Sequence, residues 1–442
     1  MERWQQRLSY GVSDLACNLV LTLMSSYVLI FYTDVFSIGT SAAGSVMLAA
    51  RLIDAVMVVL LGIAIDRTHT RWGKSRPYFL FGAVPFGLAV VLAFWAPELP
   101  ASARVMYAFV TYTLLSVMYS LVNLPVSSIT PALTTDPWER SLLVTTRMIC
   151  AMVGVTIVST ATSPLIEALG GGDGRRGYRT VAVIIGAAAA LMLLGAFVFI
   201  REKVPAKPPV KGDVLGDFKA MDGQCVLFAM IGVVFYIAYC FRGASILYYF
   251  TYNLQRPDLI PMIGIFGTLS GLPALLAAPY VLKHITRRLA MFLSVLTYAL
   301  GTLLLAFGPF SAALYGGLVL TGMGFYMVQM VNFSTGPDVI DYCRCKSGRD
   351  IAGTYSALST SISKLSMGLG SFGVGLLLKY GGYQEGAAAQ TAQALGSIKM
   401  GFVWIQLLIC AVVLVMVPFY RLDKEMPAVR AALAHEGEET AR

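Results

Sequence analysis

Residues 51–77, RLIDAVMVVLLGIAIDRTHTRWGKSRP, form an apolar stretch that holds Arg51 and Asp54 and then ends in a basic turn. A charged side chain inside a lipid bilayer costs about 3 kcal/mol or more, so such residues commonly face a protein interior or a water-filled path. The stretch therefore predicts a membrane span that takes part in transport.

The composition extends this interpretation to the whole chain. Of its 442 residues 57% are hydrophobic and 13% are charged, whereas about 25% of the residues of a soluble protein are charged. A spanning helix needs about 20 mostly apolar residues. We predict an all-α polytopic membrane protein with twelve spans, at residues 9–36, 40–65, 77–97, 104–131, 141–166, 178–200, 224–251, 258–282, 289–307, 310–335, 351–379 and 397–419.

The positive charges predict the orientation of these spans. Of the 33 Lys and Arg residues, 22 fall on the side that holds both termini, seven on the opposite side and four within spans. Because cytoplasmic loops carry the excess of Lys and Arg, we expect both termini in the cytoplasm and the chain in a bacterial-type inner membrane. The net charge of +9 is thus a topology signal, and we expect no nucleic-acid partner. The N-terminus lacks the pattern of a removable signal peptide.

A polar segment, residues 201–223, divides the chain into two halves of six spans. We predict a six-helix bundle at 1–200, a central cytoplasmic loop at 201–223, a second bundle at 224–420 and a cytoplasmic tail at 421–442. No internal repeat is evident by eye, so this division rests on the number of spans. It fits a transporter whose site lies between two bundles. A channel or a receptor is the alternative, but no re-entrant filter segment is visible.

The sequence offers little for enzyme or metal chemistry. Seven cysteines fall mostly in spans or on the cytoplasmic side, which implies no disulfide framework. Cys343 and Cys345 beside Asp341 lack the usual spacing of zinc ligands. There is no nucleophile-base set and no phosphate-binding loop. We expect no enzyme activity, no cofactor and no bound metal, and a monomer that contacts lipid.

Polar residues inside the spans are the candidates for binding a solute. Asp14 and Asn18 share one face of the first span, and Tyr119, Asn123 and Ser127 recur every four residues beside Pro125 in the fourth. A phenol, an amide and a hydroxyl suit a polyhydroxylated ligand. Helix packing is the alternative role for these groups.

Three further cations, Arg147, Arg242 and Lys364, lie in other spans. A guanidinium suits two adjacent hydroxyls or a carboxylate. The surplus positive charge can pair with Asp14, Asp338 or Asp341, or neutralise an anionic solute such as a uronate.

Two groups are candidates for coupling and gating. Asp54 can pair with Arg51 three residues earlier, or serve as the site of a coupling proton, with Asp14 as a second candidate. In the turn after residue 65, Asp66, Arg67, Arg71 and Lys74 are candidates for a cytoplasmic gate held by ion pairs. The alternative role of this turn is that of a positive anchor at the membrane surface.

Several runs, SYGVSD, ARLIDA, DRTHTRWGKSRPY, NLPVSSITPALT, ERSLLVTTRM and SKLSMGLG, resemble the glycoside-pentoside-hexuronide:cation symporters, a melibiose permease-like family. The resemblance covers most of residues 8–380. It implies the fold of the major facilitator superfamily. It also implies that Tyr119, Arg147 and Lys364 contact sugar or line the cavity.

The chain departs from that family at several positions. Asn18 and Asn123 stand where the family resemblance implies acids, Cys17 where it implies a lysine, and Ser127 where it implies a stacking tryptophan. The family's Asp-Ala-x-x-Asp-Pro pattern is Asp54-Ala55-Val56-Met57-Val58-Val59 here. Because Val58 offers no oxygen and Met57 is a soft ligand, the pattern does not predict a full sodium site.

These features predict a secondary transporter that moves a sugar, glycoside or uronide by alternating access. Proton coupling through Asp54, uncoupled facilitation and coupling through other acids such as Asp14 stay open. Alternatives are an exporter or carrier of an amphipathic compound or lysolipid, and outside transport a transporter-like sensor.

Overall fold

The computed structural model describes residues 3–66, 68, 70–134, 137–202, 221–307, 311–347, 352–384, 387, 389–423, 425, 426 and 429. They divide into two compact units. The first comprises Met1–Pro209, Cys240–Ile265 and Met367–Gly401, and the second comprises Val210–Tyr239, Phe266–Ser366 and Phe402–Arg442.

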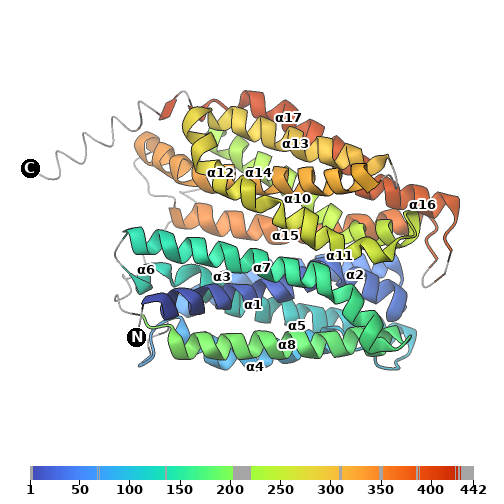
Figure 1. Ribbon diagram of the computed structural model, residues 1–442. Helices are drawn as coiled ribbons and strands as arrows, with labels where there is room; N and C mark the ends of the chain where they lie inside the picture. The colour runs from blue at the N-terminus through green and yellow to red at the C-terminus, as the bar shows by residue number, and fades with distance from the viewer. Residues whose placement is uncertain are drawn as a thin grey trace, which may run out of the picture. The chain divides into compact units, whose positions relative to one another are not determined.

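Long helices account for most of both units (Figure 1). In the first half of the chain they are α1 (Arg3–Ser26), α2 (Val28–Ile30), η1 (Phe31–Val35), α3 (Thr40–Asp66), α4 (Arg76–Ala93), α5 (Ala101–Ser128), α6 (Thr130–Leu133), α7 (Pro137–Gly170) and α8 (Gly174–Phe199).

The second half contains α10 (Gly223–Tyr248), η2 (Tyr249–Asn253), η3 (Pro257–Leu259), α11 (Ile260–Met262), η4 (Ile263–Thr268), α12 (Gly271–His284), α13 (Arg287–Ala306), α14 (Ser311–Ser347), α15 (Ala352–Tyr380), α16 (Ala392–Lys399), η5 (Met400–Trp404), α17 (Ile405–Met416) and η6 (Val417–Phe419).

Eleven of the twelve expected spans appear among the described residues as helices long and apolar enough to cross a membrane. The eighth, expected at 258–282, is instead divided among α11, η4 and α12. Its run IPMIGIFGTLSGLP contains two prolines and three glycines, which weaken the regular hydrogen-bond ladder of an α-helix. Apolar composition predicted the segment correctly, but not its continuity as one helix.

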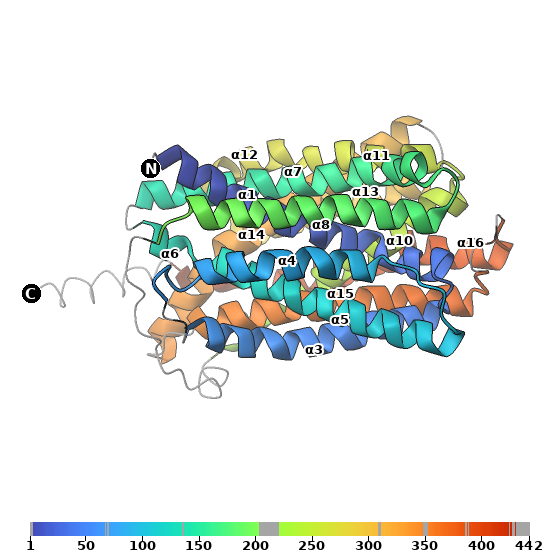
Figure 2. The ribbon, with the colours of Figure 1, turned by 90° about the horizontal axis from the view of Figure 1, so that it is seen from below.

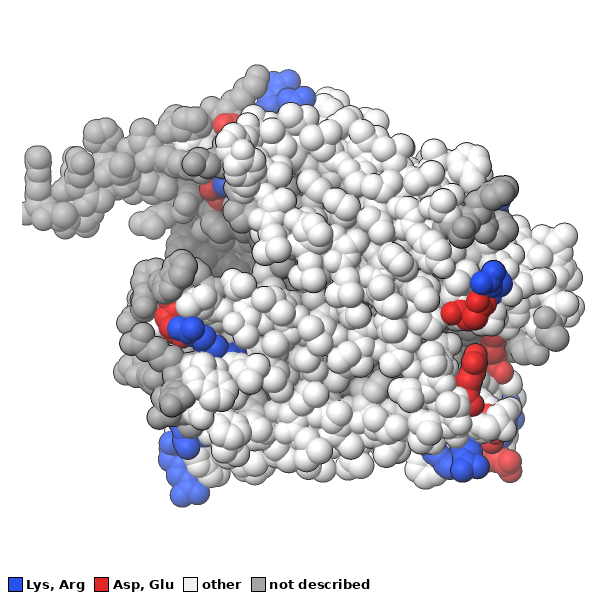
Figure 3. Space-filling view, viewed as in Figure 1, with Lys and Arg blue, Asp and Glu red and all other residues white. Residues whose placement is uncertain are grey.

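The surface agrees with a membrane environment. Figure 3 shows a face that is uncharged over most of its area, with the described Lys, Arg, Asp and Glu residues gathered near the helix ends. Large exposed apolar side chains such as Leu191 and Leu276 are 69% and 79% exposed. Contiguous apolar surface of this kind is covered by lipid in membrane proteins.

Within the first unit, α1 packs against α7 and α8, α4 against α5 and α8, and α3 against α5. Figure 2 shows these helices running nearly parallel. Glycines allow the closest approaches: a Cβ on Gly87 of α4 would lie 2.7 Å from the carbonyl oxygen of Gly186 of α8. This packing brings polar side chains of α3 and α5 face to face.

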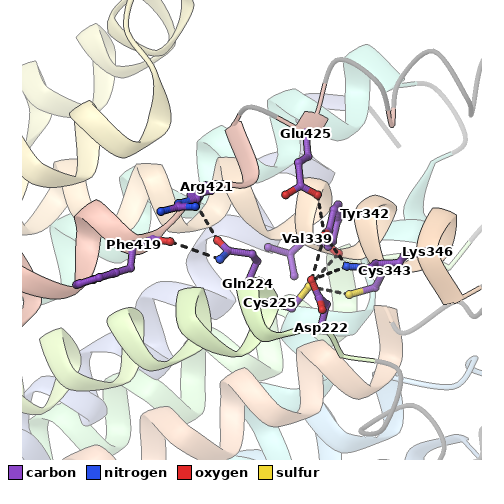
Figure 4. Close-up of polar contacts among 10 residues, drawn as sticks. All are labelled: Asp222, Gln224, Cys225, Val339, Tyr342, Cys343, Lys346, Phe419, Arg421 and Glu425. Carbon is purple, nitrogen blue, oxygen red and sulfur yellow. Dashed lines mark hydrogen bonds and ion pairs between the residues drawn. The ribbon is translucent and has the colours of Figure 1, made fainter.

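Within the second unit, the start of α10 is joined to the end of α14 and to the chain after η6 (Figure 4). Lys346 donates to the Asp222 carboxylate at 2.9 Å, and the Tyr342 hydroxyl lies 3.0 Å from Asp222 and 2.8 Å from Glu425. The Cys343 thiol, considered above as a metal ligand, lies 2.7 Å from that of Cys225. These contacts fix the ends of the second unit's helices.

Candidate functional site

Arg51 and Asp54 of α3 form the centre of a buried polar network. Their side chains are 1% and 0% exposed, and Arg51 Nη1 lies 3.6 Å from Asp54 Oδ2. Asp54 accepts hydrogen bonds from two serines of α5, from Ser120 at 2.5 Å and from Ser116 at 3.0 Å. Each carboxylate oxygen is therefore satisfied by a hydroxyl group.

The guanidinium of Arg51 is held by the same helix. Arg51 Nη1 donates to Ser116 at 3.0 Å, and Nη2 donates to the Tyr112 hydroxyl at 3.0 Å. Ser116 thus accepts from the cation and donates to the anion. The predicted ion pair is confirmed, and it belongs to a network that spans α3 and α5.

A second polar cluster joins α1 to α7. Arg147 Nε lies 3.1 Å from Asp14 Oδ1, with side-chain exposures of 29% and 6%. Asn18 Nδ2 donates to the Asp14 carbonyl oxygen at 2.8 Å and to Asp14 Oδ2 at 3.2 Å. Close packing brings the two helices together here, since a Cβ on Gly154 would lie 3.1 Å from the carbonyl oxygen of Leu15. Three of the predicted site residues are thus in contact.

The three residues of the stripe predicted on α5 differ in their exposure to solvent. Tyr119 is 7% exposed, with its ring centroid 6.5 Å from that of Phe86. Asn123 is half-buried. Ser127 is exposed and donates to the carbonyl oxygen of Leu124 in its own helix. Only the first part of the stripe, Tyr119 and Asn123, is therefore enclosed by protein.

The two remaining intramembrane cations are also buried. Arg242 of α10 and Lys364 of α15 are each 7% exposed. Arg242 belongs to the first unit and Lys364 to the second.

In its described residues, the turn proposed as a gate is held by Glu202, a residue of the same half of the chain. The Glu202 carboxylate accepts from the backbone N–H groups of Lys74, Ser75 and Arg76 at 2.8 to 3.1 Å. It caps the N-terminus of α4, where backbone donors lack helical partners. The Arg71 guanidinium lies 4.6 Å from the Trp72 ring. Arg67 and the Asp66 side chain lie outside the described residues, so the gating role stays a prediction.

Tyr112, Ser116 and Ser120 are not among the site residues predicted from the sequence. They recur every four residues on α5, as Tyr119, Asn123 and Ser127 do, so the same periodicity signal was present. Residues seven positions apart on an α-helix differ by only about 20° around its axis, so both stripes lie on one face of α5. Only the packing of α5 against α3 shows that Tyr112, Ser116 and Ser120 are the part of this face that contacts Arg51 and Asp54.

Comparison with known proteins agrees with this architecture. A family model described as "MFS/sugar transport protein" matches residues 9–424. The isoprimeverose transporter of Lactiplantibacillus pentosus is 35% identical over 98% of this chain and 92% of its own length. The putative glycoside/cation symporter YagG of Escherichia coli K12 is 29% identical over 97% of this chain and 94% of its own.

Solved structures show the same fold at low sequence identity. The nucleoside transporter NupG superposes with a TM-score of 0.64 at 15% identity over 94% of this chain and 99% of its own. The xylose transporter XylE from E. coli gives 0.65 at 13% identity over 94% and 98%.

Proposed function

Since this chain belongs to the MFS/sugar transport family, we propose that it is a secondary transporter that moves a sugar or glycoside across the membrane by alternating access. The similarity to the isoprimeverose transporter over 98% of the chain carries this proposal. The named relatives are transporters, and we propose that this chain likewise has no enzyme activity and works as a monomer. The substrate contacts proposed are Asn18, Tyr119, Asn123, Ser127, Arg147 and Lys364.

The charge balance of the site favours a neutral solute over a uronate. Arg147 is compensated by Asp14, and Arg51 by Asp54. Two of the four intramembrane cations therefore supply no surplus positive charge for an anionic ligand. Asn18 and Arg147 offer amide and guanidinium donors that suit sugar hydroxyls.

For coupling, we propose a proton carried by Asp54 in preference to sodium. The Arg51 guanidinium lies 3.0 Å from Ser116 and 3.6 Å from Asp54, among the oxygens that a sodium ion would need. Two positive charges about 4 Å apart repel by roughly 4 kcal/mol at an effective dielectric constant of 20. Serine hydroxyls can donate to a carboxylate or accept from a carboxylic acid, so the network tolerates both forms of Asp54.

Transport by purified protein in proteoliposomes tests the proposal. A panel of neutral sugars, glycosides and uronides is scanned with imposed proton and sodium gradients. We expect uptake of a neutral glycoside, stimulated several-fold by an inward proton gradient. In Asp54→Asn this stimulation is lost while exchange of the same solute across the membrane persists.

The control variant is Asp258→Asn, which removes an exposed acid paired with Arg256 at 2.9 Å and should behave as wild type. Stimulation by sodium would refute proton coupling, and equal rates with and without a gradient would identify an uncoupled facilitator. Preference for uronides would refute the charge argument. Failure to move any panel member in right-side-out or everted vesicles would refute sugar transport itself.

A further inference from the structure

Asp34, which none of the predicted sites includes, is the centre of another polar cluster within the first unit. Tyr252 donates to Asp34 Oδ2 at 2.6 Å, and Tyr383 donates to Oδ1 at 2.7 Å. Thr33 donates to Oδ1 at 2.8 Å and lies 2.8 Å from the Tyr248 hydroxyl. Three hydroxyl groups thus bond one carboxylate, and a fourth contacts one of the three.

The partners of Asp34 come from distant parts of the chain. Asp34 lies in η1 at the end of the first span, Tyr252 lies in η2, 218 residues later, and Tyr383 follows α15, 349 residues later. The Tyr383 ring also contacts the rings of Tyr248 and Tyr252 edge to face, with 5.5 Å between the ring centroids in each pair. The cluster therefore ties the first half of the chain, residues 1–200, to two separate segments of the second.

The backbone around Asp34 and Tyr252 has the same geometry. Each lies in a π-helical turn of five residues, η1 or η2, and each turn is followed by a non-glycine residue with positive φ, Ser37 at 56° and Gln255 at 52°. A left-handed conformation is costly for such residues, so its recurrence points to a built feature. Asp34 and Tyr252 occupy equivalent places in the two halves.

Helices of the two halves also approach each other closely at two places beside the Asp34 cluster. A Cβ on Gly375 of α15 would lie 2.6 Å from the carbonyl oxygen of Thr40 at the start of α3, and one on Gly44 would lie 3.1 Å from Phe372. On another side, a Cβ on Gly264 of η4 would lie 2.2 Å from the Thr160 hydroxyl of α7. Helices of the two halves therefore meet with no space between their backbones beside the Asp34 cluster.

We propose that Asp34, Tyr252 and Tyr383 form a gate that closes the transport path on the side of the membrane opposite to the termini. This rests on the proposed function, because a transporter by alternating access must separate its two halves on each side in turn. Asp34 and Tyr252 each lie at the end of the first span of their half, and Tyr383 precedes the last span. All three therefore lie one crossing away from the termini. Three neutral hydroxyl donors hold the carboxylate, so opening the gate separates no ion pair among them.

A reversible cross-link tests the gate. In Asp34→Cys/Tyr383→Cys, a short bis-methanethiosulfonate reagent should join the two halves, reduce transport at least tenfold and release it on reduction. The matched control is Asn253→Cys/Leu395→Cys, two positions outside the gate that belong to the same half and lie close together, since Asn253 Nδ2 donates to the Leu395 carbonyl oxygen at 2.9 Å. Its cross-link should leave transport within twofold, as should the reagent with wild type and its seven native cysteines.

Unchanged transport by the cross-linked Asp34/Tyr383 pair would overturn the proposal, as would failure of that pair to cross-link or an equal block by the control pair. Wild-type transport is measured first, so failure of the proposed function is seen separately.

A second measurement does not depend on transport. Ser245, 2% exposed, lies one turn before Tyr248 on α10. In Ser245→Cys, an impermeant maleimide added from the side opposite to the termini should label position 245 slowly, as read by mass spectrometry. Adding Asp34→Asn or Tyr383→Phe should raise the rate several-fold, because each loosens the closed state. Equal rates in all three backgrounds would overturn the proposal.

Discussion

At the scale of single residues, Asp14 and Arg147 offer a test of whether a buried ion pair serves folding or binding. Asp14→Ala leaves Arg147 without its carboxylate and should lower the free energy of unfolding by about 1–3 kcal/mol, with Arg147 partly exposed to solvent. The variant Asp14→Ala/Arg147→Ala removes both charges and should regain most of that loss without regaining transport.

Thermal unfolding in detergent and transport in proteoliposomes measure the two effects separately. Restored transport in the double variant would show that neither residue binds the solute.

How far the sequence predicts such contacts depends on their distance along the chain. Arg51 and Asp54 are three residues apart on one helix, so their pairing followed from helical periodicity alone. Asp14 and Arg147 lie on separate helices, and sequence reasoning could name only a set of acids that could serve Arg147. Asp34 was overlooked because an acid at the end of a span is unremarkable until its distant tyrosine partners are known.

Asp222 allows a pH test outside the membrane spans. The hydrogen bond from Lys346 lowers the pKa of the Asp222 carboxyl below its ordinary value. A depressed pKa means that the contribution to stability is complete above the ordinary aspartate pKa of about 3.9 and is lost as the pH falls through the lower, folded-state value. Since the Lys346 side chain is 56% exposed, solvent screens the pair and its contribution to stability is small.

We therefore expect Asp222→Asn to be slightly less stable than wild type, by the same amount at pH 7 and pH 5. The difference should shrink below pH 4. Thermal unfolding across this range measures it, and a difference that grows as the pH falls would contradict the assignment.

At the scale of elements, the contact between α3 and α15 depends on glycine. Gly375→Ala would place a methyl group 2.6 Å from the Thr40 carbonyl oxygen, closer than real Cβ atoms approach. Because the clash arises only when the two helices meet, we expect net transport to fall at least fivefold while the variant still folds and binds solute. Binding measured by calorimetry and transport measured in proteoliposomes separate the two effects.

Gly195→Ala on α8 is the matched control. Apart from the neighbouring backbone of α8 itself, no atom lies within 4 Å of a Cβ at that position, so the substitution should leave transport unchanged and, through helix propensity, cost no stability. Transport by Gly375→Ala at the wild-type rate would show that this helix contact is not needed for closure.

At the scale of the whole molecule, the structure reveals a repeat that was not evident in the sequence. The backbone N–H groups of Phe36 and Ile38 bond to the carbonyls of Phe31 and Tyr32, and those of Leu254 and Arg256 bond to the carbonyls of Tyr249 and Phe250. Likewise Glu202 caps the start of α4, and Asp423 accepts from the Arg288 N–H at the start of α13. Backbone geometry and capping recur while side chains diverge, because hydrogen-bond closure constrains the chain more than residue identity does.

The orientation of the whole molecule in the membrane decides on which side of the membrane the proposed gate lies. Lys and Arg residues number 22 on the side of the termini and seven on the other, so we predict both termini in the cytoplasm. Fluorescent protein that matures only in the cytoplasm should fluoresce when fused at either terminus. Alkaline phosphatase, active only outside, should be active when fused after Gln384 and inactive when fused after Lys74. The opposite pattern would place Asp34 on the cytoplasmic face and make its tyrosine cluster an inner gate.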